Sequence, residues 1–159
     1  MAEEPPPVLD PIDRAILELL QANGRISNAE LAQQIELSPS ATLNRIRRLE
    51  ERGLIRGYTA LLDREKLGYD MLCFVQLTLQ VHQPEQVETI RQAIEQMPEV
   101  LECYHVTGDY DYLLKVVIKN RKDLERFVLT RLTPIPGVAR IYTSLVLNEV
   151  KSSTVLPLD

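Results

Sequence analysis

The chain has 159 residues, 45% hydrophobic and 26% charged, which is the composition of an ordinary globular protein with one medium or two small domains. No segment approaches the run of about 20 apolar residues that a membrane helix needs. The first seven residues have neither the basic start nor the apolar stretch of a secretion signal. These features argue against a membrane or secreted protein and predict one that works in the cytoplasm. The net charge of −5 argues at first against nucleic acid, because binding requires basic groups to neutralise phosphates.

The charge is unevenly distributed along the chain, however. Residues 10–37 carry two Arg and five acidic side chains, a net charge of −3. Residues 38–57 carry five Arg against Glu50 and Glu51, a net charge of +3. This N-terminal block is neutral in sum but polarised, which allows a small DNA-binding unit to exist inside an acidic protein.

The N-terminal block has the signals of two closely spaced helices after an arm. Residues 1–9 are Pro-rich and are expected to form a flexible arm. Asp10 is an N-cap residue, Pro11 suits the first helical position, and apolar residues follow at helical spacing until Asn23-Gly24. A second, short helix begins at Ser27-Asn28-Ala29-Glu30, which is a capping-box pattern.

A third helix starts almost immediately after the second. Ser38-Pro39 provides its cap, it runs to about Arg52, and Gly53 is its expected C-terminal stop. Two helices joined by only three or four residues cannot lie antiparallel and must cross steeply. Residues 10–57 are therefore predicted to form a helix-turn-helix domain.

The third helix has one apolar and one polar side. At about 100° per residue, Leu43, Ile46 and Leu49 form the expected buried stripe. Arg pairs with guanine and Asn with adenine in the major groove, so the opposite face suits base recognition, although a solvated charged face is the alternative. Arg25, Ser27 and Arg56 are expected to contact phosphates. The complete set of candidate DNA-binding residues is Arg25, Ser27, Ser38, Ser40, Ala41, Asn44, Arg45, Arg47, Arg48, Arg52 and Arg56.

The second half of the chain contains an internal repeat with an offset of 38 residues, since Met97-Pro98-Glu99-Val100 is echoed by Ile135-Pro136-Gly137-Val138. Each copy is preceded by a strand pattern and an amphipathic helix. The predicted order is β-α-β-β-α-β, a ferredoxin-like α+β domain over residues 71–151. It follows a linker over residues 58–70 that is predicted to contain a strand and a hinge, and it precedes a tail over residues 152–159.

The predicted strands carry apolar residues on both faces, for example Phe74 with Val75 and Leu113 with Leu114. Two helices cover only one face of a sheet, so the other face needs a partner, and we expect a homodimer formed by sheet packing. Cys73 and Cys103 lie in these strands without the spacing of a redox or zinc site, and both are expected to be buried free thiols.

The segment Thr107-Gly108-Asp109-Tyr110-Asp111 joins the second and third strands of this domain. It can be a tight hairpin turn in which Gly and Asp satisfy the backbone. Alternatively, its two carboxylates suit an α-ammonium group and its free backbone N–H groups suit a carboxylate, which together favour an amino-acid ligand.

Five motifs occur in order along the chain: Leu9-Asp10-x-x-Asp13-x-x-Ile16-Leu17, Gly24-Arg25-Ile26-Ser27-Asn28-x-Glu30-Leu31, Leu37-Ser38-Pro39-Ser40, Arg47-Arg48-Leu49-Glu50-x-x-Gly53-x-Ile55-x-Gly57-Tyr58 and Gly108-Asp109-Tyr110-Asp111-Tyr112. Through them the chain resembles the Lrp/AsnC family of transcriptional regulators over essentially its whole length. The resemblance implies amino-acid effectors bound at subunit contacts near the Gly-Asp loop, and dimers that assemble into octamers or similar rings. It also implies that Ser144, Leu145 and Val146 could line the same pocket as Thr107 to Asp111.

Three other functions are open at this point. An enzyme would need Asp109 and Asp111 as an acid/base pair, because His82 and His105 stand alone and no phosphate loop is present. An RNA-binding protein would share the fold, but the chain has two Phe and no Trp with which to stack bases. An architectural DNA-compacting protein would keep the helix-turn-helix without a sensor. No cofactor or metal is expected.

Overall fold

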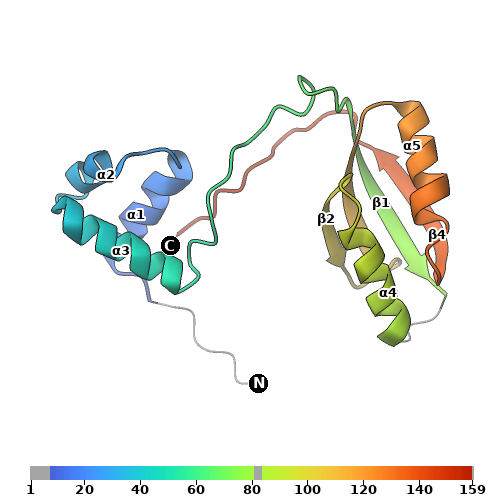
Figure 1. Ribbon diagram of the computed structural model, residues 1–159, viewed down its shortest axis with the longest axis horizontal. Helices are drawn as coiled ribbons and strands as arrows, with labels where there is room; N and C mark the ends of the chain where they lie inside the picture. The colour runs from blue at the N-terminus through green and yellow to red at the C-terminus, as the bar shows by residue number, and fades with distance from the viewer. Residues whose placement is uncertain (1–7, 81–83, 159) are drawn as a thin grey trace. The chain divides into compact units, whose positions relative to one another are not determined.

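The computed structural model describes residues 8–80 and 84–158, so most of the predicted arm and His82 lie outside the described residues. The chain forms two compact units (Figure 1). The first contains Met1–Leu61 together with Lys151–Asp159, and the second contains Leu62–Val150. Among the described residues, no helix has both the length and the apolar content to cross a bilayer.

The first unit contains the three predicted helices, α1 (Pro11–Ala22), α2 (Asn28–Gln34) and α3 (Pro39–Glu51). Their predicted caps are confirmed, because each start is held by a side-chain oxygen that accepts a backbone N–H. The Asp10 carboxylate caps α1, and Ser27 and Glu30 form the capping box of α2. Helix α3 is followed by its C-cap Arg52 and then by Gly53, whose φ of +70° is readily adopted only by glycine. The core of the unit is built around Ile16, Leu31 and Leu49.

The tail from Lys151 onward is part of the first unit, although it follows the second unit in sequence. The side-chain amide of Gln21 on α1 holds the backbone of Leu156 at both groups. Its Nε2 donates to the Leu156 carbonyl at 3.1 Å, and its Oε1 accepts from the Leu156 N–H at 2.6 Å. The first unit is therefore discontinuous in sequence.

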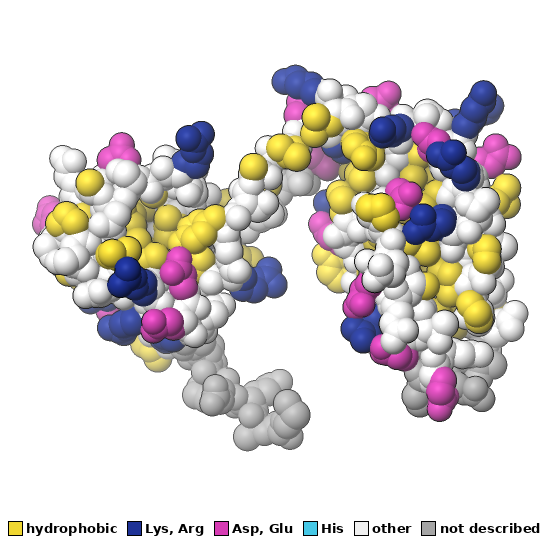
Figure 2. Space-filling model, viewed as in Figure 1, with side chains coloured by type: hydrophobic (Ala, Val, Ile, Leu, Met, Phe, Trp, Pro, Cys, Tyr) yellow, Lys and Arg dark blue, Asp and Glu magenta, His cyan; other side chains and the backbone are white. Residues whose placement is uncertain are grey.

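The linker differs from its prediction. No strand forms between residues 52 and 70, and the segment contains a turn at residues 64–68. Several apolar side chains of the connecting segments are exposed, as Figure 2 shows for the stretch between the two units. They include Leu61, Leu62, Leu147 and Val150.

The second unit has the predicted ferredoxin-like order (Figure 1). Its elements are β1 (Met71–Leu79), α4 (Pro84–Glu95), β2 (Val100–His105), β3 (Tyr112–Ile118), α5 (Arg121–Phe127), a π-helical turn η1 (Val128–Leu132) and β4 (Val138–Leu145). The strands form one sheet in the order β2-β3-β1-β4, and every neighbouring pair is antiparallel. The two β-α-β copies are thus interleaved, with their first strands β1 and β3 in the centre.

Alternate residues of the central strands build the core of this unit. Cys73, Val75 and Leu77 of β1 lie opposite Val116, Leu114 and Tyr112 of β3, and all six are buried. They pack with apolar residues of the two helices, including Ile90, Ile94, Phe127 and Leu132. The helices therefore cover the face of the sheet to which this set belongs.

The alternate residues of the strands that do not belong to this core form the second face of the sheet. Tyr104 of β2 and Tyr142 of β4 are more than half exposed. Both lie on this second face, because Tyr104 pairs with Leu113 and Tyr142 pairs with Gln76. The prediction that Cys103 is buried is wrong, because it lies on the edge strand β2, whose residues 101–105 are all exposed. Cys73, in the central strand β1, is buried as expected.

Candidate DNA-binding helix and effector loop

Hydrogen bonds across the turn fix the crossing of α2 and α3. The Asn28 side-chain amide, at the start of α2, donates to the carbonyl of Pro39 at the start of α3 over 2.9 Å. The buried Thr42 hydroxyl donates to the carbonyl of Ser38 at 3.0 Å, and the Ser38 hydroxyl accepts from the Ala41 N–H at 3.2 Å. The Asn28 bond thus ties the start of α2 to the start of α3, and the two bonds to Ser38 fix the first turn of α3 itself.

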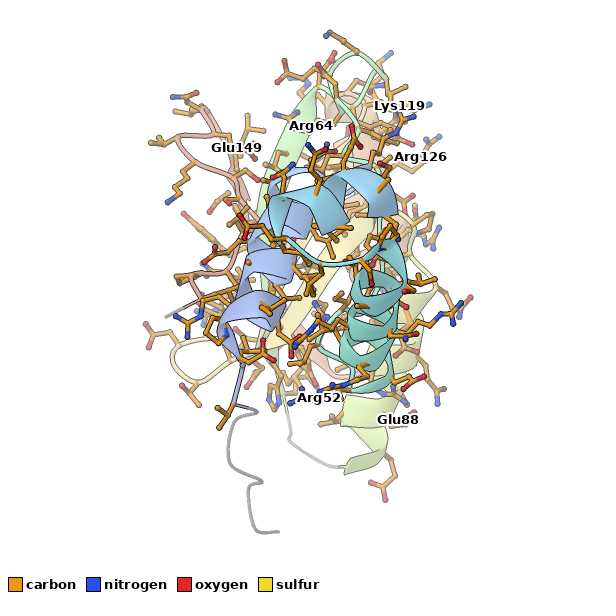
Figure 3. The ribbon with its side chains drawn as sticks, turned by 90° about the vertical axis from the view of Figure 1, so that its left-hand side faces the viewer. Arg52, Arg64, Glu88, Lys119, Arg126 and Glu149 are labelled. Atoms are coloured by element: carbon orange, nitrogen blue, oxygen red, sulfur yellow. The ribbon has the colours of Figure 1, made fainter. Side chains whose placement is uncertain are left out.

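The outward side of α3 carries hydrogen-bond donors that are available to a ligand. Ser40, Asn44, Arg47, Arg48 and Arg52 are all exposed. Within the part of the chain that the structure describes, none of these three arginines forms an ion pair. Figure 3 labels Arg52 at the C-terminal end of the helix. Exposed guanidinium groups that have no carboxylate partner within the fold suit a polyanion, because binding does not require them to break an ion pair.

The inward side of α3 differs from the expected stripe. Leu43 is 38% exposed, whereas Thr42 and Leu49 are fully buried. The stripe therefore runs through Thr42, Arg45, Ile46 and Leu49, which follow the helical spacing i, i+3, i+4 and i+7. At about 100° per residue, Leu43 lies about 120° from Leu49, at the edge of the buried face.

Arg45 lies on this inward side, although the sequence suggested it as a DNA contact. Its Nη1 lies 2.6 Å from a carboxylate oxygen of Asp10 and 2.6 Å from one of Asp13, both on or at the start of α1. The hydrogen bond from Arg45 holds the pKa of Asp10 below its ordinary value, and the same pairing raises the pKa of Arg45. Arg45 thus joins α3 to α1. The sequence contains one signal for this pairing, the two acidic residues Asp10 and Asp13 three positions apart at the start of α1. This spacing alone does not identify Arg45 as their partner.

The other candidate residues of this unit fall into two groups. Ser27 and Ser38 use their hydroxyls as helix caps, and Ala41 is half-buried at the start of α3. Arg25, before α2, and Arg56, after α3, are exposed. Exposed cations at these positions suit phosphate contacts, since helix starts and flanking segments normally lie against the DNA backbone.

The segment Thr107–Asp111 joins β2 to β3 in the second unit, and it is tied to the end of β1. The Asp111 N–H donates to the Leu77 carbonyl at 2.9 Å, and the Asp111 carboxylate accepts from the Leu79 N–H at 2.7 Å. One of the two acids therefore has a role within the fold. Gly108 and Asp109 are exposed, and the φ of +131° at Gly108 disfavours any side chain there.

Ser144, Leu145 and Val146 lie elsewhere in the unit. Ser144 pairs with Phe74 and Leu145 with Cys73, near the start of β1, whereas Asp111 contacts the end of that strand. Five residues separate Phe74 from Leu79, which is roughly 17 Å along a strand. Within one chain these two groups of predicted effector residues do not line one pocket.

Comparisons with known proteins agree with this division into two parts. Residues 9–56 match the family model described as winged helix-turn-helix DNA-binding, and residues 72–156 match the one described as Lrp/AsnC ligand binding domain. The matched ranges cover the three helices of the first unit and all of the second unit's sheet except its first residue, Met71.

Similar proteins of known name or structure cover almost the full chain. The leucine-responsive regulatory proteins of Klebsiella pneumoniae and of Escherichia coli (strain K12) are each 43% identical to it over 145 residues, which is 91% of this chain and 88% of the relative. A transcriptional regulator of Neisseria meningitidis, solved as a complex with L-methionine, is 37% identical with a TM-score of 0.91 over 96% of this chain and 98% of its own. The structure of AsnC from Escherichia coli is 30% identical with a TM-score of 0.85 over 94% and 99%. The chain belongs to the Lrp/AsnC family of DNA-binding transcriptional regulators with a ligand-binding domain.

Proposed function

We propose that the protein reads a specific DNA sequence by placing α3 in the major groove, and that Asn44, Arg47 and Arg48 contact base edges. The observation that carries this proposal is the row of exposed, unpaired donors on the outward side of a helix whose start is capped and pinned. Small side chains at Ser40 and Ala41 allow the start of α3 to approach the bases closely. We assign Arg25, Ser27, Ser38, Arg52 and Arg56 to the DNA backbone, and we leave Arg45 out of the contact set because it is engaged with α1.

The assignment is tested on a site selected from random DNA with the purified protein. Asn44→Ala and Arg48→Ala should each lose about 1–3 kcal/mol on that site and relax the preference at one base position. Arg56→Ala should weaken binding to specific and random DNA alike and reduce the salt dependence by about one contact. Arg121→Ala, an exposed cation of the other unit, is the matched control. Equal losses on specific and random DNA for Asn44→Ala and Arg48→Ala would refute base reading.

We also propose that two chains pack their open sheet faces together as a homodimer, and that dimers assemble further into an octamer or similar ring. The exposed aromatic side chains of Tyr104 and Tyr142 on that face support the first step, because apolar area of this kind is normally covered. A monomer by analytical ultracentrifugation at micromolar concentration would refute it. A dimer also requires two half-sites about one helical turn apart or a multiple of it, so inserting about five base pairs between them should abolish cooperative binding.

An amino acid is the effector that we propose for the Gly108–Asp111 loop, at a contact between chains. The exposed glycine backbone can receive a carboxylate, and the exposed Asp109 can receive an ammonium group. In this arrangement Ser144, Leu145 and Val146 would complete the pocket from another chain. The solved relative that contains L-methionine supports an amino acid as the ligand class.

This site is tested by a thermal-shift screen of free amino acids, since a ligand that binds only the native state raises stability by RT ln(1 + [L]/Kd). Asp109→Asn is the sharper variant, because Asp111 also supports the fold through Leu79. It should reduce the shift while leaving DNA binding without ligand intact. No stabilisation by any amino acid would favour the architectural DNA-compacting alternative.

We propose finally that the protein has no catalytic function and acts in the cytoplasm, in association with the nucleoid. Membership of a family of transcriptional regulators supports both statements, because such a regulator acts by binding DNA and the DNA that it binds is in the nucleoid. Asp111 is a poor acid/base candidate, since its carboxylate accepts a backbone hydrogen bond within the fold.

A further inference from the structure

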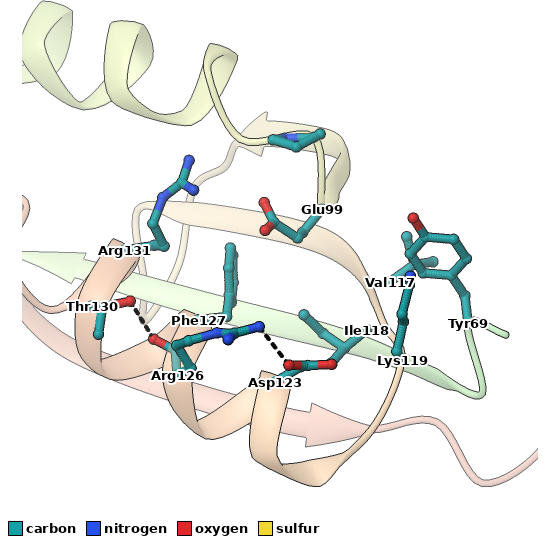
Figure 4. A pocket seen from close by; sticks show the side chains of 11 residues that line it. Tyr69, Glu99, Val117, Ile118, Lys119, Asp123, Arg126, Phe127, Thr130 and Arg131 are labelled. Carbon is teal, nitrogen blue, oxygen red and sulfur yellow. Dashed lines mark hydrogen bonds and ion pairs between the residues drawn. The ribbon is translucent and has the colours of Figure 1, made fainter.

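A cavity of about 420 Å³ lies in the second unit, away from the Gly108–Asp111 loop (Figure 4). The Gly108–Asp111 loop precedes β3 at Tyr112, whereas the cavity is lined by the end of that strand and by Lys119 after it. Six residues of extended chain between Tyr112 and Ile118 separate the two places by roughly 20 Å. The volume falls in the range of small-molecule sites. The cavity is therefore a second candidate site, independent of the proposed effector loop.

Three charged side chains at the cavity lack a partner of opposite charge. The Oε2 atom of Glu99 is buried and has no hydrogen-bond partner. Lys119 and Arg131 form no ion pair with any described residue; Lys119 lies over the ring of Tyr69, and Arg131 donates only a long bond of 3.3 Å to a backbone carbonyl. A buried acceptor without a donor is uncommon in folded proteins, because leaving it unpaired costs free energy.

The remaining charged groups at the cavity are already neutralised. Arg126 and Asp123 form an ion pair on α5, drawn as a dashed line in Figure 4. The apolar floor comes from Val117, Ile118 and Phe127. In the view of Figure 4, Glu99 lies between Arg131 on one side and Lys119 on the other. The unsatisfied set is consequently two cations flanking one anion above an apolar surface.

The carboxylate of Glu99 is not shared by the second copy of the internal repeat, which has Gly137 at the corresponding position. The backbone of Glu99 is fixed, however, because its carbonyl accepts from the Val117 N–H at 2.9 Å. A charged side chain is thus held at the cavity by rigid backbone, as in a preorganised binding site.

We propose that this cavity binds an acidic α-amino acid, with its two carboxylates at Lys119 and Arg131 and its ammonium group at Glu99. The ligand has two negative charges and one positive charge, which complements the unpaired set of two positive and one negative. Its methylene groups would lie on Ile118 and Phe127. A neutral amino acid leaves one cation unpaired, and a dicarboxylate without an amine leaves the Glu99 oxygen unsatisfied. The charge pattern therefore selects against both.

Titration calorimetry of the full chain tests the proposal with L-glutamate and two analogues. L-glutamine lacks the second charge, and glutarate lacks the ammonium group. We expect L-glutamate to bind at least about tenfold more tightly than either, because each analogue loses one charge-assisted contact. Equal affinity for glutamate and glutamine, or for glutamate and glutarate, would overturn the proposal.

Substitutions then locate the ligand. Glu99→Gln, Arg131→Gln and Lys119→Gln should each weaken glutamate binding about tenfold or more. Lys122→Gln, at an exposed cation of α5 that does not line the cavity, should change nothing. Folding is checked by the melting temperature without ligand, which Glu99→Gln should not lower because it removes an unpaired buried charge. Lys119 is exposed, so loss of binding in its variant does not reflect unfolding.

The loop variant separates this proposal from the effector site proposed above. Asp109→Asn should leave glutamate binding unchanged, and the cavity variants should leave the thermal shift by the loop ligand unchanged. If Asp109→Asn abolishes glutamate binding and the cavity variants retain it, the cavity proposal is wrong and the loop site stands. If no amino acid other than glutamate binds, and it depends on Glu99, the loop proposal fails and the cavity proposal stands.

Discussion

Removing the Arg45 side chain distinguishes a structural arginine from a DNA contact on the same helix. Arg45 makes hydrogen bonds of 2.6 Å to both Asp10 and Asp13, and Asp13 is only 4% exposed. Arg45→Ala would leave the Asp13 carboxylate buried without its cation, whereas water can replace the partner at the half-exposed Asp10. Breaking a buried pair from one side costs about 3–5 kcal/mol, and we take the lower end, about 3 kcal/mol, because Arg45 itself is partly exposed.

The loss should be read out in the full chain by hydrogen exchange of the α1 and α3 amides, detected by mass spectrometry. Where exchange is limited by opening of the whole unit, about 3 kcal/mol corresponds to roughly a hundredfold loss of protection. The melting temperature of a unit of this size should fall by roughly 12–24 °C. Arg48→Ala, on the exposed side of the same helix, is the matched control and should leave protection unchanged while weakening DNA binding.

A double variant isolates the pair. Asp13→Asn in the Arg45→Ala background should recover part of the stability, because it removes the uncompensated charge. If Arg45→Ala instead leaves exchange and melting unchanged and loses affinity for DNA, then Arg45 acts at the DNA and the reasoning from the ion pair is refuted.

Three further predictions concern the turn, the loop and acid pH. Glu36 has a φ of +56°, which is unfavourable for a residue with a Cβ. Glu36→Gly should therefore raise the free energy of unfolding, measured by thermal denaturation, by up to about 1 kcal/mol. A clear loss of stability would show that the Glu36 side chain supports the turn. Asp111→Ala should destabilise the second unit by about 1–3 kcal/mol without ligand, because the Leu79 N–H loses its acceptor. Asp111→Asn keeps a side-chain oxygen and should retain most of this stability. Equal melting temperatures of the two variants would contradict this role. The pKa of Asp10 is lowered by Arg45, so the stability that the Asp10 carboxylate contributes is complete above about pH 4 and is lost as the pH falls through the folded-state pKa. Denaturant titrations at several acid pH values should therefore show a flatter dependence of the free energy of unfolding on pH for Arg45→Ala. Identical pH dependence in the two proteins would argue against this pairing in solution.

The parts of the fold that depend on local chemistry could be predicted from the sequence. The caps at Asp10, Ser27 and Ser38 are such a case, because each needs only a side-chain oxygen and a backbone N–H three residues later. The β-α-β repeat was also predictable, since apolar periodicity changes with each element and the Pro-containing motif recurs 38 residues later.

The features that depend on distant segments could not be predicted in this way. Arg45 finds its partners 32 and 35 residues away, and a helical wheel shows only that it flanks the polar face. Cys103 has an apolar neighbourhood in sequence, but its exposure follows from the edge position of β2, which depends on the strand order. The cavity beside Glu99 is formed by side chains from four separate stretches of the chain, so no single sequence motif predicts it.

The hold of Gln21 on the backbone of Leu156 has a consequence for synthesis of the chain on the ribosome. The helix-turn-helix is translated first, and its tail follows only after the roughly 90 residues of the second unit. At about 5–20 residues per second, the three helices therefore exist for about 5–20 s without the segment that later lies against α1. During this interval only the capped ends and the apolar core of the three helices are available to hold them, because the contact between Gln21 and Leu156 does not yet exist.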